Sequence, residues 1–448
     1  MGTIHQGSPP LMDNLKVTLH RSSLLFPLKE TEKRSMFLSN IDQVLNFNVQ
    51  TVHFFPANSD FPPETVVEKL EMAFRRVLVP YDFLAGRLKL NSQKGRLEID
   101  CNCAGAGFAV ATSELSLADM GDLVYPNPAF QQLILGKMEA LVEEDQPLCI
   151  VQVTLFKCGG FAMGISNSHA TFDGISFKIF LENLASLAAD KPLAVTPYTN
   201  RHLLAARSPP RITFPHPEMV KLEIQPGAHS NTTVFEATQE NLDFKIFRLS
   251  PDDILKLKEK AKIGGGNTVG TRVTGFNVIT ALIWRCKGLA GDDQEKMCTI
   301  LYAVDLRSRL HPPLPPSYTG NAVLTAYAAA SRRDLEESSF SELVGMVSQG
   351  AARMTDEYAR SVIDWGELNK GFPNGDVLVS SWWRLGFTEV EYPWGRPKYS
   401  CPVVYHRKDI ILLFPDIEGV GDKGVNLLVA LPSKEMEKFQ ALFNKFLA

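Results

Sequence analysis

The chain has 448 residues, of which 45% are hydrophobic and 21% are charged, and its formal net charge is −4. This composition is typical of a globular protein of two or three domains whose core needs neither disulfides nor structural metals. Its 46 basic and 50 acidic residues form no long basic block, which argues against a nucleic-acid-binding protein.

Seven scattered cysteines contain no CxxC pair, which predicts reduced thiols in a cytoplasmic protein. The first residues lack the charged start and apolar run of a signal peptide, and no stretch of 18 apolar residues occurs. We therefore expect no membrane span. We also expect a monomer without a bound metal or resident cofactor.

Helix-like and strand-like patterns alternate along the first part of the chain. The apolar spacing of residues 64–78 predicts an amphipathic helix. Residues 148–166 read as two strands that Gly159 and Gly160 join in a hairpin. Residues 174–189 return to the helical period. This alternation predicts an α/β or α+β fold.

Residues 191–235 contain seven prolines and show no periodicity. A connection this long without regular structure is unusual inside one compact domain, so we interpret it as a crossover between domains 1–190 and 236–448. The second domain is expected to begin with a strand at Asp243 and a helix over 251–262.

The stretch SHATFDG covers residues 168–174. His169 is expected just past a buried strand, and Asp173 at the N-cap of the next helix, which is where ligands gather in α/β folds. Asp is also a common N-cap, and a lone histidine is often a satisfied interior residue, so a structural role stays open for both. No third ligand stands nearby for a metal, and no GxSxG elbow indicates a serine hydrolase.

Several further motifs follow HATFDG in a fixed order. They are VDLRSR (304–309), PPLPPSYTGNAV (312–323), SSWWRLGF (380–387) and EYPWGRP (391–397), with FLSNIDQ (37–43) and RVTGFNVITALIWRCKGLA (272–290) completing the set. Together they resemble the BAHD acyltransferases of plants over nearly the whole chain. Within that family the sequence resembles the GLAUCE-type and fatty-alcohol hydroxycinnamoyl transferase branches.

The resemblance implies two similar chloramphenicol-acetyltransferase-like α/β domains with a solvent channel between them. It implies transfer of an aromatic or aliphatic acyl group from acyl-CoA, as a substrate, to an alcohol or amine. His169 would be the general base, since neutral histidine suits proton removal near pH 7, and no covalent enzyme intermediate would form. The alternatives are a non-transferring relative that binds a small molecule or acts as a lyase, and a thioesterase.

The resemblance also assigns roles outside HATFDG. Ser380 and Trp382 would line the reaction centre and donate hydrogen bonds to the oxyanion, although Trp382 could instead be core packing. Asp173, followed by Gly174, would pair with an arginine, and Arg285 is the candidate partner.

The family's DFGWG motif is altered here to EYPWG. Only Trp394 and Gly395 match, and Pro393 replaces a glycine. Because proline forbids a positive φ, this change casts doubt on the local loop shape and on CoA binding.

Two sets of substrate-binding residues are expected. The candidates for the phosphates of CoA are Lys258, Lys260 and Arg307. The alternative for each is a plain surface residue or an internal ion-pair partner, and Asp305 and Arg307 would then pair with neighbours at the domain interface. The candidates for the acceptor pocket are Leu38, Asn40, Phe387 and Thr388.

Overall fold

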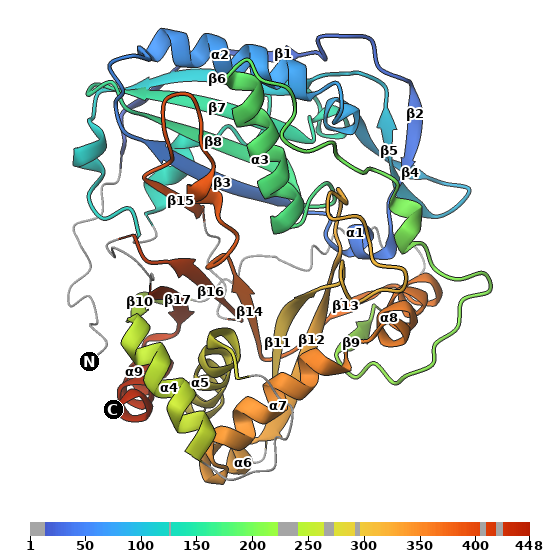
Figure 1. Cartoon of the computed structure of the whole chain (residues 1–448), viewed down its shortest axis with the longest axis vertical. Helices are drawn as coiled ribbons and strands as arrows, with labels where there is room; N and C mark the ends of the chain where they lie inside the picture. The colour runs from blue at the N-terminus through green and yellow to red at the C-terminus, as the bar shows by residue number, and fades with distance from the viewer. Residues whose placement is uncertain are drawn as a thin grey trace.

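The computed structural model divides the chain into two halves, each built on a six-stranded mixed sheet (Figure 1). It describes residues 14–124, 127–222, 241–263, 273–291, 296–403, 409–417 and 424–448. In Figure 1 the N-terminal sheet lies in the upper half and the C-terminal sheet in the lower half.

The N-terminal sheet has the strand order β1-β6-β7-β8-β3-β15, and β6 and β7 are its one parallel pair. Its strands are β1 (Val17–Leu25), β3 (Asn48–Phe55), β6 (Ala106–Ser113), β7 (Cys149–Phe156), β8 (Phe161–Ser168) and β15 (Tyr399–Pro402). Helices α2 (Pro63–Val77) and α3 (Gly174–Ala188) pack on one face, and the 3₁₀ turns η2 (Leu117–Met120) and η3 (Pro128–Leu133) cover the other. The neighbours Phe54 and Phe55 therefore enter different cores, as the period-two geometry of a strand requires.

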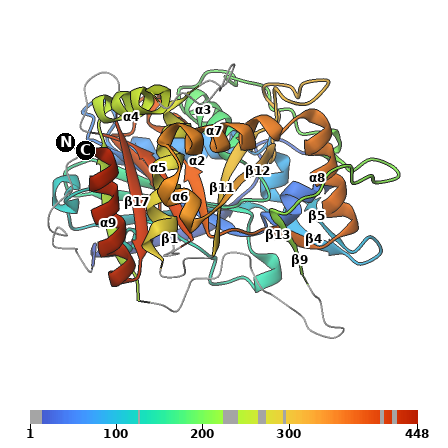
Figure 2. The ribbon, with the colours of Figure 1, turned by 90° about the horizontal axis from the view of Figure 1, so that it is seen from below.

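The C-terminal sheet has the order β10-β17-β16-β14-β11-β12. Its strands are β10 (Asp243–Leu249), β11 (Met297–Asp305), β12 (Val323–Ser331), β14 (Val377–Ser381), β16 (Ile410–Pro415) and β17 (Val425–Leu431). The helices α4 (Pro251–Ile263), α5 (Gly275–Ala290), α7 (Phe340–Arg353) and α9 (Ser433–Leu447) bury its outer face, as the view from below shows (Figure 2). The opposite face carries a small apolar cluster, Ile246, Phe414 and Leu428, against which Trp382 packs.

The remaining elements are short. They are β2 (Arg34–Phe37), α1 (Asn40–Val44), η1 (Asp82–Ala85), β4 (Arg87–Asn91), β5 (Arg96–Cys101), η4 (Glu143–Asp145), η5 (Arg201–Leu204), β9 (Met219–Lys221), α6 (Arg332–Glu337), α8 (Asp356–Leu368), β13 (Gly371–Pro373) and η6 (Phe387–Glu389). Strands β2, β5 and β4 form a three-stranded sheet, and β13 pairs with β9.

The elements expected from periodicity are found within one or two residues of their expected ends. The helix expected over 64–78 is α2, the one over 174–189 is α3, and the one over 251–262 is α4. The hairpin at Gly159 and Gly160 joins β7 to β8.

The C-terminal half does not keep to residues 236–448. Strand β15 pairs with β3, with Tyr399 opposite Phe54, and Trp394 packs into the core of the N-terminal half. The EYPWG segment therefore belongs structurally to the N-terminal sheet, which it reaches through a long-range pairing that local sequence patterns do not encode.

The part of the crossover that the structure describes, residues 191–222, is anchored to the C-terminal half. Arg207 donates to Asp364 and Glu357 of α8 at 2.6 and 2.8 Å, and Ser361 of the same helix accepts from the backbone N–H of Thr213. The rest of the expected crossover, residues 223–235, lies outside the described residues.

Candidate active site

His169 begins the turn between β8 and α3 and lies between the two halves. β8 ends at Ser168, and Asp173 caps α3 by accepting from the backbone N–H of Ser176 at 2.8 Å. The backbone N–H of His169 donates to the carbonyl of Phe47, whose ring lies 5.1 Å from the imidazole. The expected positions of both motif residues are thus found, and we call residues 169–173 the base loop.

Asp173 is buried, and its partner is Arg307. The two guanidinium nitrogens of Arg307 donate to the two carboxylate oxygens of Asp173 at 2.9 and 3.0 Å. Asp173 also accepts from the backbone N–H of Ala322 at 2.9 Å. The predicted pairing of Asp173 with Arg285 is wrong, because the Arg285 guanidinium donates to the carbonyls of Leu335 and Ser338.

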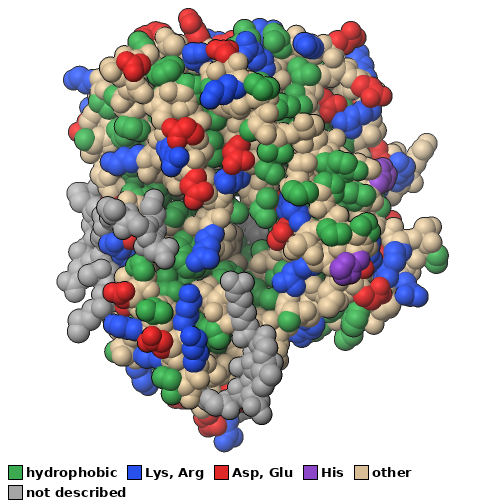
Figure 3. Space-filling view, in the orientation of Figure 1, with side chains coloured by type: hydrophobic (Ala, Val, Ile, Leu, Met, Phe, Trp, Pro, Cys, Tyr) green, Lys and Arg blue, Asp and Glu red, His purple; other side chains and the backbone are tan. Residues whose placement is uncertain are grey.

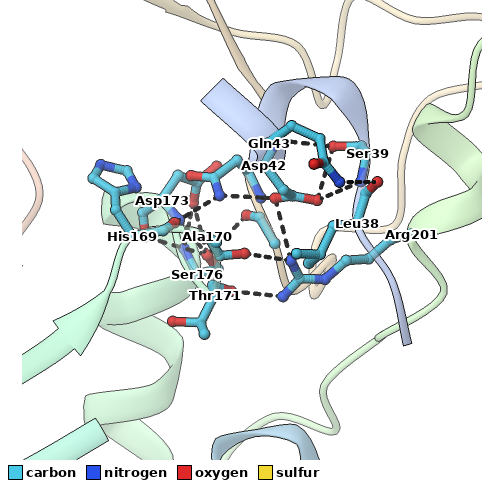
Figure 4. A network of polar contacts seen from close by, with 12 residues as sticks. Leu38, Ser39, Asp42, Gln43, His169, Ala170, Thr171, Asp173, Ser176 and Arg201 are labelled. Atoms are coloured by element: carbon cyan, nitrogen blue, oxygen red, sulfur yellow. Dashed lines mark hydrogen bonds and ion pairs between the residues drawn. The ribbon is translucent and has the colours of Figure 1, made fainter. Parts of the chain in front are cut away.

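A second buried carboxylate, Asp42 of α1, lies next to the base loop on the side away from the His169 imidazole (Figure 4). Its Oδ1 atom accepts from the Asn321 side chain at 2.8 Å and lies 3.2 Å from the Arg201 guanidinium. The Asn321 amide also donates to the carbonyl of His169 at 2.8 Å. Arg201 donates to the carbonyls of Ala170 and Thr171 at 2.6 and 2.8 Å.

The imidazole of His169 projects away from this network (Figure 4). Its Nδ1 atom is buried and has no hydrogen-bond partner among the described residues. Burial lowers the pKa of His169, while its own carbonyl oxygen and Asp173 act in the opposite direction. Since desolvation dominates, the ring stays neutral near pH 7, which is the state that a general base requires.

Ser380 and Trp382 lie at the end of β14 and are half-buried. Neither the Ser380 hydroxyl nor the Trp382 indole has a hydrogen-bond partner within the described parts of the chain. The Trp382 ring packs edge-on against Phe387 at 5.3 Å and joins apolar clusters of both halves. These two donors thus remain free at the boundary between the sheets.

The segment that follows Trp382 approaches the start of α3. A Cβ atom at Gly174 would lie 2.6 Å from a methyl carbon of Leu385, so this helix N-terminus tolerates only glycine without a shift of that side chain. The Phe387 ring lies 5.6 Å from the ring of Phe177, also on α3. These contacts connect the Trp382 segment to α3, the element that follows the base loop.

The EYPWG segment forms a tight turn. Tyr392 and Gly395 exchange two backbone hydrogen bonds of 3.2 and 3.0 Å, and Gly395 has a φ of 110°. Pro393 occupies the second position of this turn, where proline is favoured because its fixed φ fits and its missing N–H is not needed. The turn thus accommodates proline, and Trp394 packs between Phe161 and Tyr392.

The three residues expected to bind CoA lie in different environments: two are on α4, and the third is bound to Asp173. Lys258 and Lys260 lie in the second half of α4. In the space-filling view, basic and acidic side chains both occur over the lower half of the molecule, where α4 lies (Figure 3). Lys260 also reaches the carbonyl of Phe446 at 3.3 Å. Arg307 is 7% exposed and bound to Asp173, so its guanidinium belongs to the base loop rather than to a phosphate site.

The four residues expected to line the acceptor pocket lie in two different regions of the molecule. Leu38 is fully buried in the N-terminal core, and the Asn40 amide donates to the carbonyl of Ile363 and to Glu367 of α8. Phe387 and Thr388 lie next to Trp382 in sequence, and Phe387 contacts it directly.

Sequence reasoning missed the residues that hold the base loop: Asp42, Arg201 and Asn321. Two of them lie inside motifs visible in the sequence, FLSNIDQ and PPLPPSYTGNAV. Arg201 lies in the proline-rich crossover and has no comparable signal. Within the described parts of the chain, no group of three or more His, Cys, Asp or Glu side chains is placed to hold a metal, and no helix is long and apolar enough to cross a membrane.

Comparisons with known proteins agree with this architecture. The Transferase family matches residues 15–446. Acyltransferase GLAUCE of Arabidopsis thaliana is 61% identical over 99% of both chains, and omega-hydroxypalmitate O-feruloyl transferase of the same plant is 32% identical over 96% of this chain and 93% of its own.

Two solved structures share the fold. Vinorine synthase superimposes with a TM-score of 0.73 at 23% identity, covering 94% of this chain and 96% of its own. TRI101 of F. graminearum, complexed with coenzyme A and T-2 mycotoxin, gives 0.70 at 14% identity, covering 91% and 97%. The chain therefore belongs to the Transferase family, the family of BAHD acyl-CoA-dependent acyltransferases.

Proposed function

We propose that this protein transfers a hydroxycinnamoyl group from its CoA thioester to the hydroxyl group of a small-molecule acceptor, with His169 as the general base. The main support for this proposal is the His169 imidazole. Burial keeps this ring neutral, and the ring projects from a fixed loop between the halves. Two relatives that are 32% and 33% identical bear the names omega-hydroxypalmitate O-feruloyl transferase and fatty alcohol:caffeoyl-CoA acyltransferase, which supports this choice of donor and acceptor.

The proposed reaction proceeds in one addition and one elimination. His169 removes the proton of the acceptor hydroxyl as its oxygen attacks the thioester carbon. Nδ1 is buried against the protein, so Nε2 is the nitrogen that accepts this proton. The carbon–sulfur bond then breaks, and the imidazolium returns the proton to the thiolate of CoA.

The tetrahedral intermediate places a negative charge on the former carbonyl oxygen. We assign its stabilisation to the Ser380 hydroxyl and the Trp382 indole N–H. Both are donors without a partner among the described residues, and a donor already engaged with the protein would have to break that bond first. Lys258 and Lys260 remain the basic residues proposed for the CoA phosphates.

The test measures release of free CoA thiol from acetyl-, malonyl-, benzoyl-, coumaroyl- and feruloyl-CoA, with and without long-chain alcohols and amines. We expect acceptor-dependent release with the hydroxycinnamoyl donors. His169→Ala should lower this rate by about 10²- to 10⁴-fold, the usual contribution of a positioned base.

The matched control is His216→Ala. His216 is also buried, but its ring contacts Ser361 of α8 and Glu218 of the crossover. The His216→Ala variant should be less stable than the wild type and should keep the wild-type rate of CoA release. Retention of most activity in His169→Ala would refute the mechanism, and release that does not depend on an acceptor would indicate a thioesterase.

A further inference from the structure

The base loop is held by its carbonyl oxygens as well as by Asp173. The carbonyls of three consecutive residues, 169, 170 and 171, each accept a side-chain hydrogen bond of 2.6–2.8 Å. Asn321 supplies the first bond and Arg201 the other two. Carbonyls fixed in this way set the backbone direction at His169, and therefore the direction of its imidazole.

Both donors converge on one carboxylate. Asp42 Oδ1 accepts from the backbone and side-chain nitrogens of Asn321 at 3.1 and 2.8 Å, and it lies 3.2 Å from Arg201. The side chains of Asp42 and Arg201 have no exposed surface. Because a buried arginine needs a counter-charge, removal of the Asp42 charge leaves Arg201 without one.

The carboxylate of Asp42 is itself immobilised. Its Oδ2 atom closes the capping box of α1 by accepting from the backbone N–H and the hydroxyl of Ser39 at 2.9 and 2.8 Å. Phe47 lies between α1 and β3. Its carbonyl accepts from the His169 N–H, and its ring contacts the His169 ring. Oδ2 thus fixes Asp42 to its own helix, and Oδ1 holds Asn321 and Arg201, the two residues that bind the base-loop carbonyls.

Asp42, Arg201 and Asn321 come from three different regions of the chain. Asp42 lies in the N-terminal half, Arg201 in the crossover, and Asn321 between β11 and β12 of the C-terminal half. We propose that Asp42 is a positioning residue, which aims His169 by holding Asn321 and Arg201 against the three loop carbonyls. This inference rests on His169 being the base of the proposed reaction.

The test compares Asp42→Asn with Asp364→Asn. Asp364 is an equally buried carboxylate that accepts from Arg207 and from the backbone N–H groups of Arg207 and Arg211. It matches Asp42 in burial and in its arginine partner from the crossover, but its bonds fix the crossover to α8. A loss of stability alone should therefore be common to both variants.

We expect Asp42→Asn to lower kcat by about 10- to 100-fold, as a misplaced reacting group does, with little change in the KM for acyl-CoA. The acid limb of kcat/KM should also move to lower pH. The Asp42 charge raises the pKa of His169, and its removal, with Arg201 left positive, makes the imidazole harder to protonate. Asp364→Asn should keep the kcat and the pH profile of the wild type.

Wild-type kcat and acid limb in Asp42→Asn would overturn the inference, and so would equal changes in Asp364→Asn. If Asp42→Asn does not fold, Asn321→Ser and Arg201→Lys decide instead, because each loses bonds to the loop carbonyls without removing a charge. Both should lower kcat about tenfold at unchanged KM, and wild-type kcat in both would refute the proposal. Failure of the proposed function itself would appear separately, as no acceptor-dependent CoA release by the wild type, and retained activity in His169→Ala would refute the role of His169 as the base.

Discussion

The base loop and the segment from Ser380 to Tyr399 differ in how completely their polar groups are paired. In the loop, Asp173 and the carbonyls of residues 169–171 all have partners, whereas the imidazole Nδ1 of His169 has none among the described residues. In the segment, the side chains of Ser380 and Trp382 have none among the described residues, and neither do the buried polar atoms of Tyr392, Trp394 and Tyr399. A group that aims a base has to be fixed in advance, whereas a donor that meets a transient charge has to stay free.

The largest expected effect concerns the ion pair under the loop. Arg307→Met leaves the buried Asp173 carboxylate without its counter-charge and should lower the free energy of unfolding by about 3–5 kcal/mol. Arg285→Met is the control, since it removes bonds to two carbonyls and strands no buried carboxylate. Chemical denaturation of both variants measures the difference. An equal loss in the two would show that Asp173 does not depend on Arg307.

The free donors are tested by Trp382→Phe, which keeps an aromatic ring against Phe387 and removes the indole N–H. We expect kcat to fall by about 10²-fold, as for other oxyanion donors. Trp383→Phe is the matched control, because the Trp383 indole already donates to the carbonyl of Gly424 at 3.1 Å. It should lose stability at unchanged kcat. The reverse result would assign Trp382 to packing alone.

His53 lies on β3 beside β15, opposite Ser400, and its ring contacts Phe387. Its ring nitrogens contact the hydroxyls of Ser400 and Thr51 at 2.8 and 3.2 Å, and burial lowers the pKa of His53 to about 3. Between pH 6.5 and about 3 the unfolded chain binds a proton here that the folded chain does not. The folded state therefore loses up to about 1.4 kcal/mol per pH unit from this group as the pH falls.

His53→Gln should remove this contribution and make the acid side of the stability profile shallower by one proton. The free energy of unfolding, measured from pH 7 to pH 4, checks this expectation. His20→Gln, at an exposed position, should reproduce the wild-type slope. A slope unchanged in His53→Gln would mean that His53 is protonated within the fold.

The smallest effect is expected at Tyr392, whose buried hydroxyl has no described partner. Tyr392→Phe removes an unsatisfied polar group and should raise the free energy of unfolding by up to about 1 kcal/mol. Tyr81→Phe is the contrast, since the Tyr81 hydroxyl accepts from Asn183 at 2.9 Å and its loss should destabilise the fold. Thermal unfolding of the two variants measures both changes in stability. A destabilised Tyr392→Phe would indicate that the Tyr392 hydroxyl has a hydrogen-bond partner outside the described residues.

The sequence by itself determined the local elements and the position of the base. The helical periods of α2 and α3, the hairpin of β7 and β8, and the place of His169 between a strand and an N-cap all depend on neighbours within a few residues. The resemblance of the motifs to a family added the fold and the reaction class.

Only the tertiary structure decided which charges meet. Asp173 pairs with Arg307 rather than Arg285, and Asp42 joins Arg201 and Asn321, which lie more than a hundred residues away along the chain. Strand β15 likewise joins β3 across the halves. These contacts depend on how two sheets pack and where a crossover passes between them. No periodicity or spacing encodes that arrangement, because buried ion pairs are selected by three-dimensional proximity and not by separation in sequence.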